Sequence, residues 1–428
     1  MWIARLSLLL CLTLLITAAL SGCVPDELPV NPDDLPDTEQ TAEESDGEET
    51  ASDETSAEET EEENTDLEDA GDDAIASPIL PTVEFDYVAY ADTNLPAHFR
   101  NAPAGTASVV QQDNTPADNA ISNSGATLGR VLFYDVNLSA NNAVSCASCH
   151  QQAVGFSDAA VLSEGFQGGL TGRHSMALSN NRFYTPGHFF WDHRADTLED
   201  QVLMPIQDSV EMGMTLDDLV VKLAELPYYD ALFTNAFGDA EITADRISKA
   251  LAQFNRAMVS YQSKYDQAFT QGVPGQGPDF ASVFSADEEA GRLLFEQTPA
   301  NGGVGCAGCH TGVAQTATQA HNIGLELEDT DEGAGNGEFK VPSLRNIAVS
   351  APYMHDGRFA NLAEVIEHYN SGIQNNANLD SVLRRPNGQP VRLNLSQTQK
   401  QQLEAFLHTL TDSTLLTSPL FADPFPAQ

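Results

Sequence analysis

Basic residues are scarce in this chain of 428 residues. It has 19 Lys plus Arg against 63 Asp plus Glu, which gives a formal net charge of −44. Binding to nucleic acid requires a basic face that neutralises phosphates, so the composition argues against nucleic acid as a partner. A basic protein partner remains compatible with this charge, although an acidic run is more often simply a solvated surface.

Long apolar runs and strand-like alternation are also scarce. The apolar run at residues 6–20 is too short to span a membrane comfortably, and the overall composition is that of a globular protein. Helical spacing is common instead. Apolar residues recur at three- and four-residue steps from Ile247 to Tyr265, and again within residues 396–410. These patterns predict a mainly α protein, with one long helix over the first of the two stretches.

The N-terminus has the pattern of an export signal. Arg5 precedes the apolar run, and the quartet LSGC ends the segment at Cys23. This quartet resembles the bacterial lipobox, in which the chain is cut before the cysteine and the thiol is lipidated. It predicts a signal peptide at residues 1–22 and a protein on the periplasmic side of a bacterial membrane or cell envelope, lipid-anchored at Cys23. The alternative is an ordinary signal peptide with an incidental cysteine.

A low-complexity acidic segment follows the signal. Residues 24–75 contain 23 Asp plus Glu and no Lys or Arg, and they have almost no aromatic residues. Such a segment cannot bury enough apolar surface to offset the entropy lost on ordering. We therefore interpret residues 23–80 as a disordered acidic tether that holds the folded part away from the membrane.

Only six cysteines are present, and none remains for a disulfide framework. Cys11 leaves with the signal peptide and Cys23 takes the lipid. The other four form two identically spaced pairs, which are Cys146, Cys149, Cys306 and Cys309.

The folded part contains an internal duplication. LGRVLF at residues 128–133 and AGRLLF at residues 290–295 each precede a cysteine pair, with 17 and 15 residues from the glycine to the first cysteine. Ser285 with Glu288 has a capping-box pattern and predicts a helix start before the second copy. The glycine- and proline-rich residues 272–278 indicate a linker. We expect two tandem domains, at residues 81–271 and 279–420.

Both cysteine pairs belong to Cys-x-x-Cys-His motifs, at residues 146–150 and 306–310. This spacing is typical of c-type haem attachment, in which the two thiols form thioethers to the haem and the histidine binds the iron. The motifs predict two covalently bound c-type haems, with His150 and His310 as proximal ligands. A zinc site that uses the cysteine pairs is the alternative.

Several further motifs resemble the bacterial di-haem cytochrome c peroxidase family, which includes the enzyme that matures tryptophan tryptophylquinone. The resemblance covers roughly residues 120–415. It is carried by GRVLFYDVNLSANNAVSCASCH, FFWDHRADTLEDQ, VPSLRN and APYMHDGRF, in the family's order. It implies two cytochrome c-like haem domains in tandem, the first with a peroxidatic haem and the second with an electron-transfer haem.

The resemblance also implies catalytic residues near the first haem. Trp191 matches the tryptophan that lies between the haems, where an aromatic side chain can relay an electron. Gln201 and Glu211 stand 10 and 20 residues beyond Trp191 and match a distal amide and carboxylate. A carboxylate there can move a proton during O–O cleavage, and the amide can orient the peroxide. Taken alone, Trp191 could equally be a core residue and Glu211 a carboxylate near a helix dipole.

The second haem departs from many family members, in which a methionine is its sixth ligand. The matching position lies 14 residues beyond His355 and is Tyr369. A tyrosine ligand resembles the quinone-maturing enzyme and should lower that haem's potential. Met354 and His368 are rival ligands.

Two further matches concern the first haem and the domain junction. Many family members close the first haem with a distal histidine, whose matching position is near Gly168. His174 is the nearest candidate but falls close to the family's calcium ligand, so we expect it not to bind iron, and calcium is doubtful. The other calcium contacts match the carbonyls of Ser350 and Pro352. Arg345 is expected to meet a haem propionate, which suits a bidentate guanidinium.

The sequence therefore predicts an oxidoreductase that reduces hydrogen peroxide to water with electrons from a small cytochrome c or a cupredoxin. Two alternatives remain. One is a di-haem oxidase that acts on a protein or organic substrate through high-valent haems, and the other is a non-enzymatic electron-transfer cytochrome. Glu211 with Gln201 argues against the carrier, and Tyr369 supports the remote oxidase.

Overall fold

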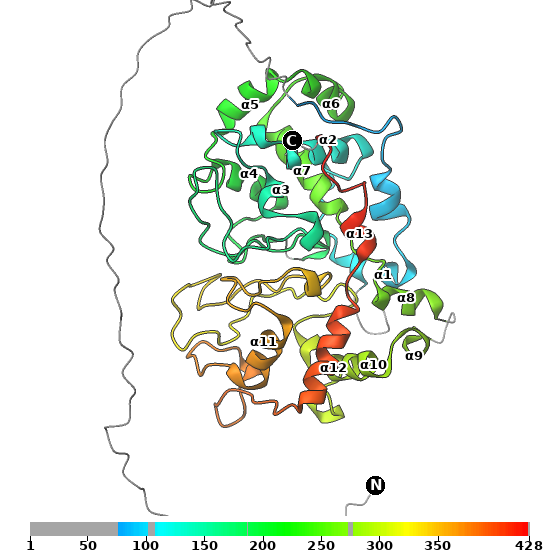
Figure 1. Ribbon diagram of the computed structural model, residues 1–428, viewed down its shortest axis with the longest axis vertical. Coiled ribbons are helices and arrows are strands. Elements are labelled where there is room, and N and C mark those ends of the chain that lie inside the picture. The colour runs from blue at the N-terminus through cyan, green and yellow to red at the C-terminus, as the bar shows by residue number, and fades with distance from the viewer. Residues whose placement is uncertain (1–75, 102–107, 186, 273–276, 427–428) are drawn as a thin grey trace, which may run out of the picture. The chain divides into compact units, whose positions relative to one another are not determined.

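The computed structural model describes residues 76–101, 108–185, 187–272 and 277–426. The predicted signal peptide, Cys23 and most of the predicted tether lie outside these residues, as does most of the predicted linker. In the described part of the chain the regular elements are helices, joined by loops with isolated β-bridges (Figure 1). The mainly α prediction is confirmed.

Helices α2 (Asn123–Tyr134) and α7 (Ala244–Ala257) form the framework of the first half. They cross at Gly129, where a Cβ would lie only 2.0 Å from the carbonyl oxygen of Ala250 and 2.8 Å from Cβ of Phe254. Glycine is needed here because the two backbones approach too closely for any side chain. Helices α4 (Leu198–Gln207), α5 (Leu216–Ala224) and α6 (Pro227–Phe237) pack around this pair.

The second half repeats this arrangement with α10 (Ala286–Glu296) and α12 (Gln397–His408). A Cβ on Gly291 would lie 1.8 Å from the carbonyl oxygen of Gln402 and 2.9 Å from Cβ of Phe406. The spacing from the contacted carbonyl to the phenylalanine is four residues in both halves. The duplication predicted from the two Gly-Arg motifs therefore extends to the helix crossing, and the predicted capping box of Ser285 and Glu288 is present.

One expected element is divided. The long helix predicted from Ile247 to Tyr265 is two helices, because α7 ends at Ala257 and α8 (Lys264–Gln271) begins after Ser263. Between them the carboxylate of Asp412 accepts hydrogen bonds from the backbone N–H groups of Tyr261 and Gln262, both at 2.9 Å. These N–H groups thus find an acceptor far away in the sequence, and the helix ends.

The remaining elements are short. The α-helices are α1 (Ala97–Arg100), α3 (Cys146–Cys149), α9 (Phe280–Val283), α11 (Leu362–Glu367) and α13 (Ser413–Thr417). The π-helices are η1 (Ala89–Thr93) and η9 (His368–Gly372), and the 3₁₀-helices are η2 (Val109–Gln112), η3 (Val136–Leu138), η4 (Gln152–Val154), η5 (Asn181–Phe183), η6 (Pro299–Asn301), η7 (Cys306–Gly308), η8 (Ile347–Val349) and η10 (Ser381–Leu383). None of the described helices is long and apolar enough to cross a membrane.

The C-terminal segment returns to the first half. After α13, Phe421 is fully buried against the rings of Tyr87 and Phe254. The carbonyl of Leu420 accepts a hydrogen bond from the Tyr87 hydroxyl at 2.8 Å. In Figure 1 this segment, drawn in red, runs from α12 in the second half up to α2 and α7 in the first. The two predicted domains thus share a core, and their boundaries stay an interpretation.

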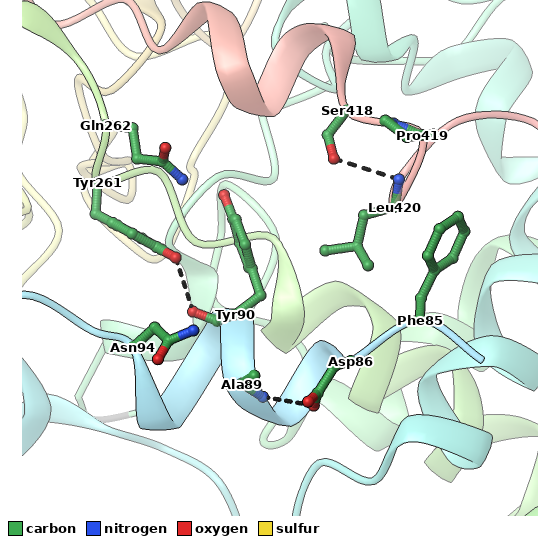
Figure 2. A pocket seen from close by; sticks show the side chains of 10 residues that line it. All are labelled: Phe85, Asp86, Ala89, Tyr90, Asn94, Tyr261, Gln262, Ser418, Pro419 and Leu420. Atoms are coloured by element: carbon green, nitrogen blue, oxygen red, sulfur yellow. Dashed lines mark hydrogen bonds between the residues drawn. The ribbon is translucent and has the colours of Figure 1, made fainter. Parts of the chain in front are cut away.

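A shallow pocket of about 460 Å³ lies where this tail meets the N-terminal segment (Figure 2). Tyr90, Tyr261 and Leu420 line it, and the Tyr261 hydroxyl donates to the carbonyl of Tyr90 at 3.0 Å. None of the haem-motif residues lines this pocket, so it belongs to the packing of the tail and not to the predicted site.

Candidate functional site

The first Cys-x-x-Cys-His motif is one helical turn followed by a tight loop. Helix α3 holds Cys146 and Cys149, and His150 ends it. Nδ1 of His150 lies 3.0 Å from the carbonyl oxygen of Phe156. Because a carbonyl can only accept, Nδ1 carries the proton and Nε2 is the free ring nitrogen. Gly155, with φ 76°, makes the turn that brings the Phe156 carbonyl back. This is the usual way in which a protein orients a metal-binding histidine.

The second motif has the same outline but a looser histidine. Cys306 begins η7, and Cys309 and His310 follow. Nδ1 of His310 is buried and has no hydrogen-bond partner among the described residues. Burial lowers the pKa of His310 to about 4, and the facing carbonyl of Gln315 only partly opposes this shift. The loop from His310 to Gln315 is one residue shorter than the loop from His150 to Phe156.

The four thiols suit the attachment chemistry predicted for them. All four cysteines are free. Burial raises the pKa of Cys146 and of Cys306 to about 12 and that of Cys149 to about 11. These sites disfavour a charged thiolate, whereas a thioether carries no charge and no ionisable proton. With one free imidazole nitrogen beside each pair, the residues fit a c-type haem in each half.

Glu211 lies beside the first motif. Its loop is held by hydrogen bonds from Phe166 N to the Glu211 carbonyl and from Ala140 N to the carbonyl of Met212, both 2.9 Å. Burial and the nearby Asp208 raise the pKa of Glu211, which Arg194 partly opposes. Burial dominates the raised thiol pKa values of the first motif, and the charge of Glu211 adds to them. The structure therefore brings this carboxyl group to the first cysteine pair.

Gln201 stands on α4, in the second turn after the Thr197 cap. Its side chain is half-buried, and its amide makes no hydrogen bond with any other described residue. Asp208 ends the same helix, and its carboxylate accepts a hydrogen bond from the N–H of Glu211 at 3.1 Å. Helix α4 therefore positions both Gln201 and the loop of Glu211.

Tyr369 lies beside the second motif, on the π-helix η9. Burial raises its pKa above the usual tyrosine range, and the nearby Cys306 and Cys309 add to that shift. No hydrogen bond joins its hydroxyl to another described residue. Single π-helical turns are frequent at functional sites. Of the rival ligands, His368 bonds through Nε2 to the carbonyl of Ile323 at 3.0 Å, and Met354 packs against the core with φ 77°.

Trp191 joins the two halves. Its indole N–H donates to the carbonyl of His174 at 2.8 Å, and its own carbonyl accepts from the N–H of Lys340 at 2.8 Å. His174 N–H in turn donates to the carbonyl of His355, also at 2.8 Å. Trp191 is therefore held between the motifs by contacts to both halves.

An ion network surrounds this junction. Arg173 of the first half donates two hydrogen bonds to Asp331 of the second half, both 2.7 Å, and a third to Asp192 at 2.6 Å. Arg194 donates to the other oxygen of Asp192 at 2.9 Å. Charged bidentate contacts of this kind fix geometry as well as adding energy, so the loop of Trp191 is clamped to the second half.

Two predicted residues have other partners. Both ring nitrogens of His174 face protein groups, with Nε2 at 3.2 Å from the Ser157 hydroxyl and Nδ1 at 3.2 Å from backbone carbonyls. The guanidinium of Arg345 is fully buried and bonds to Asp266, with N···O distances of 2.5 and 2.9 Å. The propionate contact of Arg345 stays a prediction. Calcium, expected mainly on backbone carbonyls, stays doubtful; in the described ranges no group of three or more His, Cys, Asp or Glu is placed to hold a metal ion.

Sequence reasoning missed several residues at the junction. Two ion pairs join segments that are far apart in the sequence. Arg173 pairs with Asp331, 158 residues away, and Arg345 pairs with Asp266, 79 residues away. Lys340 is buried beside Trp191, although lysine is rarely buried without an acidic partner. The feature of the sequence that points to Lys340 is its position directly before the VPSLRN motif.

Comparisons with known proteins agree with this geometry. Residues 123–273 match the family model of the di-haem cytochrome c peroxidases. The methylamine utilization protein MauG of Methylorubrum extorquens is 35% identical over 306 residues, which cover 69% of this chain and 80% of that protein. Cytochrome c551 peroxidase of Nitrosomonas europaea is 33% identical, over 56% of this chain and 71% of that protein. The crystal structure of a MauG-like protein associated with microbial copper homeostasis has a TM-score of 0.65 at 29% identity, covering 76% of this chain and 99% of that one.

Proposed function

The chain belongs to the di-haem cytochrome c peroxidase family and is thus an oxidoreductase, and from this we propose that it reduces hydrogen peroxide to water with electrons from a small redox protein. The family implies two c-type haems. When bound, these would supply one iron for the reaction with peroxide and a second redox centre. We propose that Cys146 with Cys149 and Cys306 with Cys309 would attach them and that His150 and His310 would bind the irons.

The placement of Glu211 carries this proposal. Its carboxyl group lies close enough to the first cysteine pair to raise the pKa of both thiols, is half-buried, and has a raised pKa of its own. Reduction of peroxide requires a proton to move from one oxygen to the other, and a carboxylate held near the reacting atoms can accept and return it. Gln201, whose amide has no hydrogen bond to another described residue, can orient the peroxide from α4.

Trp191 supports electron exchange between the halves. Its hydrogen bonds to His174 and Lys340 hold the indole at the junction, and Arg173 clamps the loop. We propose that an electron entering the second half reaches the first through this residue. The electron donor is proposed to be a small cytochrome c or a cupredoxin.

The experiment is a donor panel. Peroxide is added to the haem-loaded protein with reduced small cytochromes or cupredoxins, and donor oxidation and peroxide loss are recorded together. We expect two donor electrons for each peroxide. Peroxide loss without oxidation of any donor would contradict the proposed donor chemistry.

A second candidate function is oxidation of a protein or organic substrate at a distance, as an alternative to donor oxidation. The position of Tyr369 favours it, because a phenol beside the second cysteine pair that has no hydrogen bond to another described residue is available as a ligand. In the same panel, the remote oxidase would consume peroxide and leave donors reduced until an oxidisable substrate is added.

We also propose export and lipid anchoring at Cys23, on the strength of the LSGC quartet and the acidic segment that follows it. Cys23→Ser should release the protein into the soluble fraction, because the lipid is the proposed membrane hold. Cys11→Ser, within the predicted signal peptide, is the matched control and should leave fractionation unchanged. Equal membrane retention of the Cys23→Ser protein would contradict the anchor.

A further inference from the structure

Tyr184, which is buried, and His193, which is half-buried, form a hydrogen-bonded pair at the loop of Trp191. Tyr184 follows η5 and is 1% exposed, and its hydroxyl lies 2.6 Å from Nε2 of His193. His193 belongs to the tight loop that carries Trp191, closed by a 2.9 Å hydrogen bond from Phe189 N to the Ala195 carbonyl. When Nδ1 of His193 carries the ring proton, the phenol of Tyr184 donates to Nε2, a nitrogen base two residues from Trp191 in the sequence.

The loop holds His193 in an unusual backbone conformation. Its φ is 58°, in the left-handed region that costs a non-glycine residue about 1 kcal/mol. Glycine would relieve that cost but would remove the imidazole. Such conformations cluster at functional sites, where the rest of the structure holds them in place. The strained backbone is therefore kept at a residue whose side chain bonds to Tyr184.

The surroundings keep His193 neutral and Tyr184 protonated. Burial lowers the pKa of His193 to about 4, and the charges of Lys340 and His188 act in the same direction, opposed by Asp192. Burial also raises the pKa of Tyr184. A neutral imidazole has a lone pair at Nε2, so it can accept a proton that the phenol releases.

Lys340 completes the cluster. Its Nζ lies 2.6 Å from the centroid of the Tyr184 ring and 3.4 Å from the carbonyl of His188, and the residue is 3% exposed. No carboxylate of the described residues pairs with it, and burial lowers its pKa well below the usual lysine value. Burial therefore favours the neutral amine. Only the ammonium form of Lys340, with its positive charge over the ring, opposes removal of an electron from Tyr184.

Other buried tyrosines lack such an acceptor. The hydroxyls of Tyr87 and Tyr134 donate to backbone carbonyls, at 2.8 and 2.6 Å, and an amide oxygen is too weak a base to take the proton. Tyr229 donates to Asp135 at 2.6 Å, but that carboxylate also accepts from Tyr228 and from the N–H of residue 137. Tyr184 is the tyrosine that combines a nitrogen base with a place beside Trp191.

We propose that Tyr184 and His193 form a proton-coupled redox site that holds one of the oxidising equivalents left on the protein by peroxide. One electron leaves Tyr184 for the oxidised protein, the phenolic O–H bond breaks, and the proton moves to Nε2 of His193. The products are a neutral tyrosyl radical and an imidazolium. When the donor returns an electron, the proton returns to Tyr184. The identity of the oxidant rests on the proposed function, whereas the oxidisability of the pair does not.

The first test therefore uses an external one-electron oxidant. Flash-generated ruthenium(III) tris-bipyridine is applied to the full, haem-loaded protein, and radicals are trapped by freezing and recorded by EPR. Ring-deuterated tyrosine identifies the radical as a tyrosyl through loss of hyperfine splitting. We expect a tyrosyl signal that Tyr184→Phe removes and that the matched controls Tyr87→Phe and Tyr229→Phe retain. A signal that survives Tyr184→Phe, or that disappears with Tyr229→Phe, overturns the proposal.

Two variants test the roles of the neighbours. His193→Asn keeps a residue that tolerates the left-handed backbone but cannot take the proton, so the signal should fall several-fold. Lys340→Met keeps the length of the side chain but removes the ionisable amine, so the yield of the radical should rise below the lowered pKa of Lys340, where the unmodified side chain is charged. An unchanged yield in both variants would make the pair structural. Haem content and circular dichroism, measured for every variant, show whether it has folded.

The second test repeats the trapping with hydrogen peroxide, with no donor present and with peroxide loss recorded in the same samples. The expected result is the same Tyr184 signal. Absence of peroxide loss with a normal flash-generated signal would contradict the proposed function and leave the redox pair standing. Peroxide loss without a Tyr184 signal would overturn the role of the pair as a store of oxidising equivalents.

Discussion

Helix pair α2 and α7 of the first half and helix pair α10 and α12 of the second half cross through one kind of contact. In each pair a glycine faces a backbone carbonyl, and a phenylalanine follows four residues later. The sides facing the haem motifs differ. The first motif has Glu211 with its raised pKa nearby, and the second has the phenol of Tyr369 nearby. Duplication has kept the packing, where close contact leaves little freedom, and the two motif environments have diverged.

The histidines of the two motifs also differ, in the hydrogen bond that holds the ring. His150 is held by the Phe156 carbonyl, whereas Nδ1 of His310 has no partner in the described structure. A hydrogen bond at Nδ1 orients the ring and raises its basicity as a ligand. The proposed function places proton chemistry in the first half and electron entry in the second.

Removing one motif at a time should have the largest effect. The double variant Cys146→Ala with Cys149→Ala, and the corresponding variant at Cys306 and Cys309, should each lose one of two haems, counted by mass spectrometry. The first variant should lose the fast reaction with peroxide, and the second should keep that reaction but no longer oxidise donor. Equal loss of the peroxide reaction in both would remove the proposed division of labour.

Adding a methyl group at the helix crossings tests whether the two halves share their packing. Gly129→Ala and Gly291→Ala each place a Cβ within about 2 Å of a backbone carbonyl oxygen. Overpacking of this kind typically costs about 1–3 kcal/mol, so the urea midpoint should fall in both variants. Gly172→Ala, where a Cβ meets nothing within 4 Å, is the matched control. A midpoint unchanged by Gly291→Ala would break the structural analogy.

The pH dependence should separate the halves further. Burial raises the pKa of Glu211 above 4.5, and the proposed base is its carboxylate. Peroxide turnover should therefore fall as pH drops through that raised pKa, by about tenfold per pH unit below it. The acid limb should lie above pH 4.5 and should vanish in Glu211→Gln. An unchanged acid limb in Glu211→Gln would assign it to another group.

Weakening the clamp between the halves should have the smallest effect. Asp331→Asn removes the charge that Arg173 contacts twice, but both side chains are partly exposed and screened. We expect a loss of about 1 kcal/mol or less in the free energy of unfolding, measured by urea denaturation. Electron transfer between the halves should slow more than stability falls, because the loop of Trp191 loses one anchor. Unchanged transfer would show that Lys340 and His174 suffice to hold Trp191.

Local patterns predicted the parts of the structure that depend on near neighbours. The two haem motifs, the capping box of Ser285 and Glu288, and the helix over residues 396–410 all follow from spacings of a few residues. The glycines of the duplicated motifs marked the helices that cross. Family resemblance located Glu211 and Tyr369, and the structure places each beside its own cysteine pair.

Features that depend on distant residues escaped prediction. The helix expected to run to Tyr265 stops because Asp412, about 150 residues away, accepts its N–H groups. Arg345 has Asp266 as its partner, and Tyr184 has His193, for reasons that only the folded chain shows. Burial of Lys340 contradicts the usual preference of lysine for the surface. These contacts gather where the halves meet, since tertiary packing outweighs local pattern there.

The most direct test of the account compares Glu211→Gln with Tyr369→Phe by stopped-flow mixing with peroxide and with reduced donor. Glu211→Gln keeps shape and hydrogen bonding but loses the proton-accepting carboxylate. It should slow the peroxide reaction by about 10²- to 10⁴-fold and leave reduction of the second haem unchanged. Tyr369→Phe should shift the spectrum or potential of the second haem and leave the peroxide reaction within a few-fold. Equal peroxide rates in the Glu211→Gln and unmodified proteins would contradict the claim that the first half performs the proton chemistry.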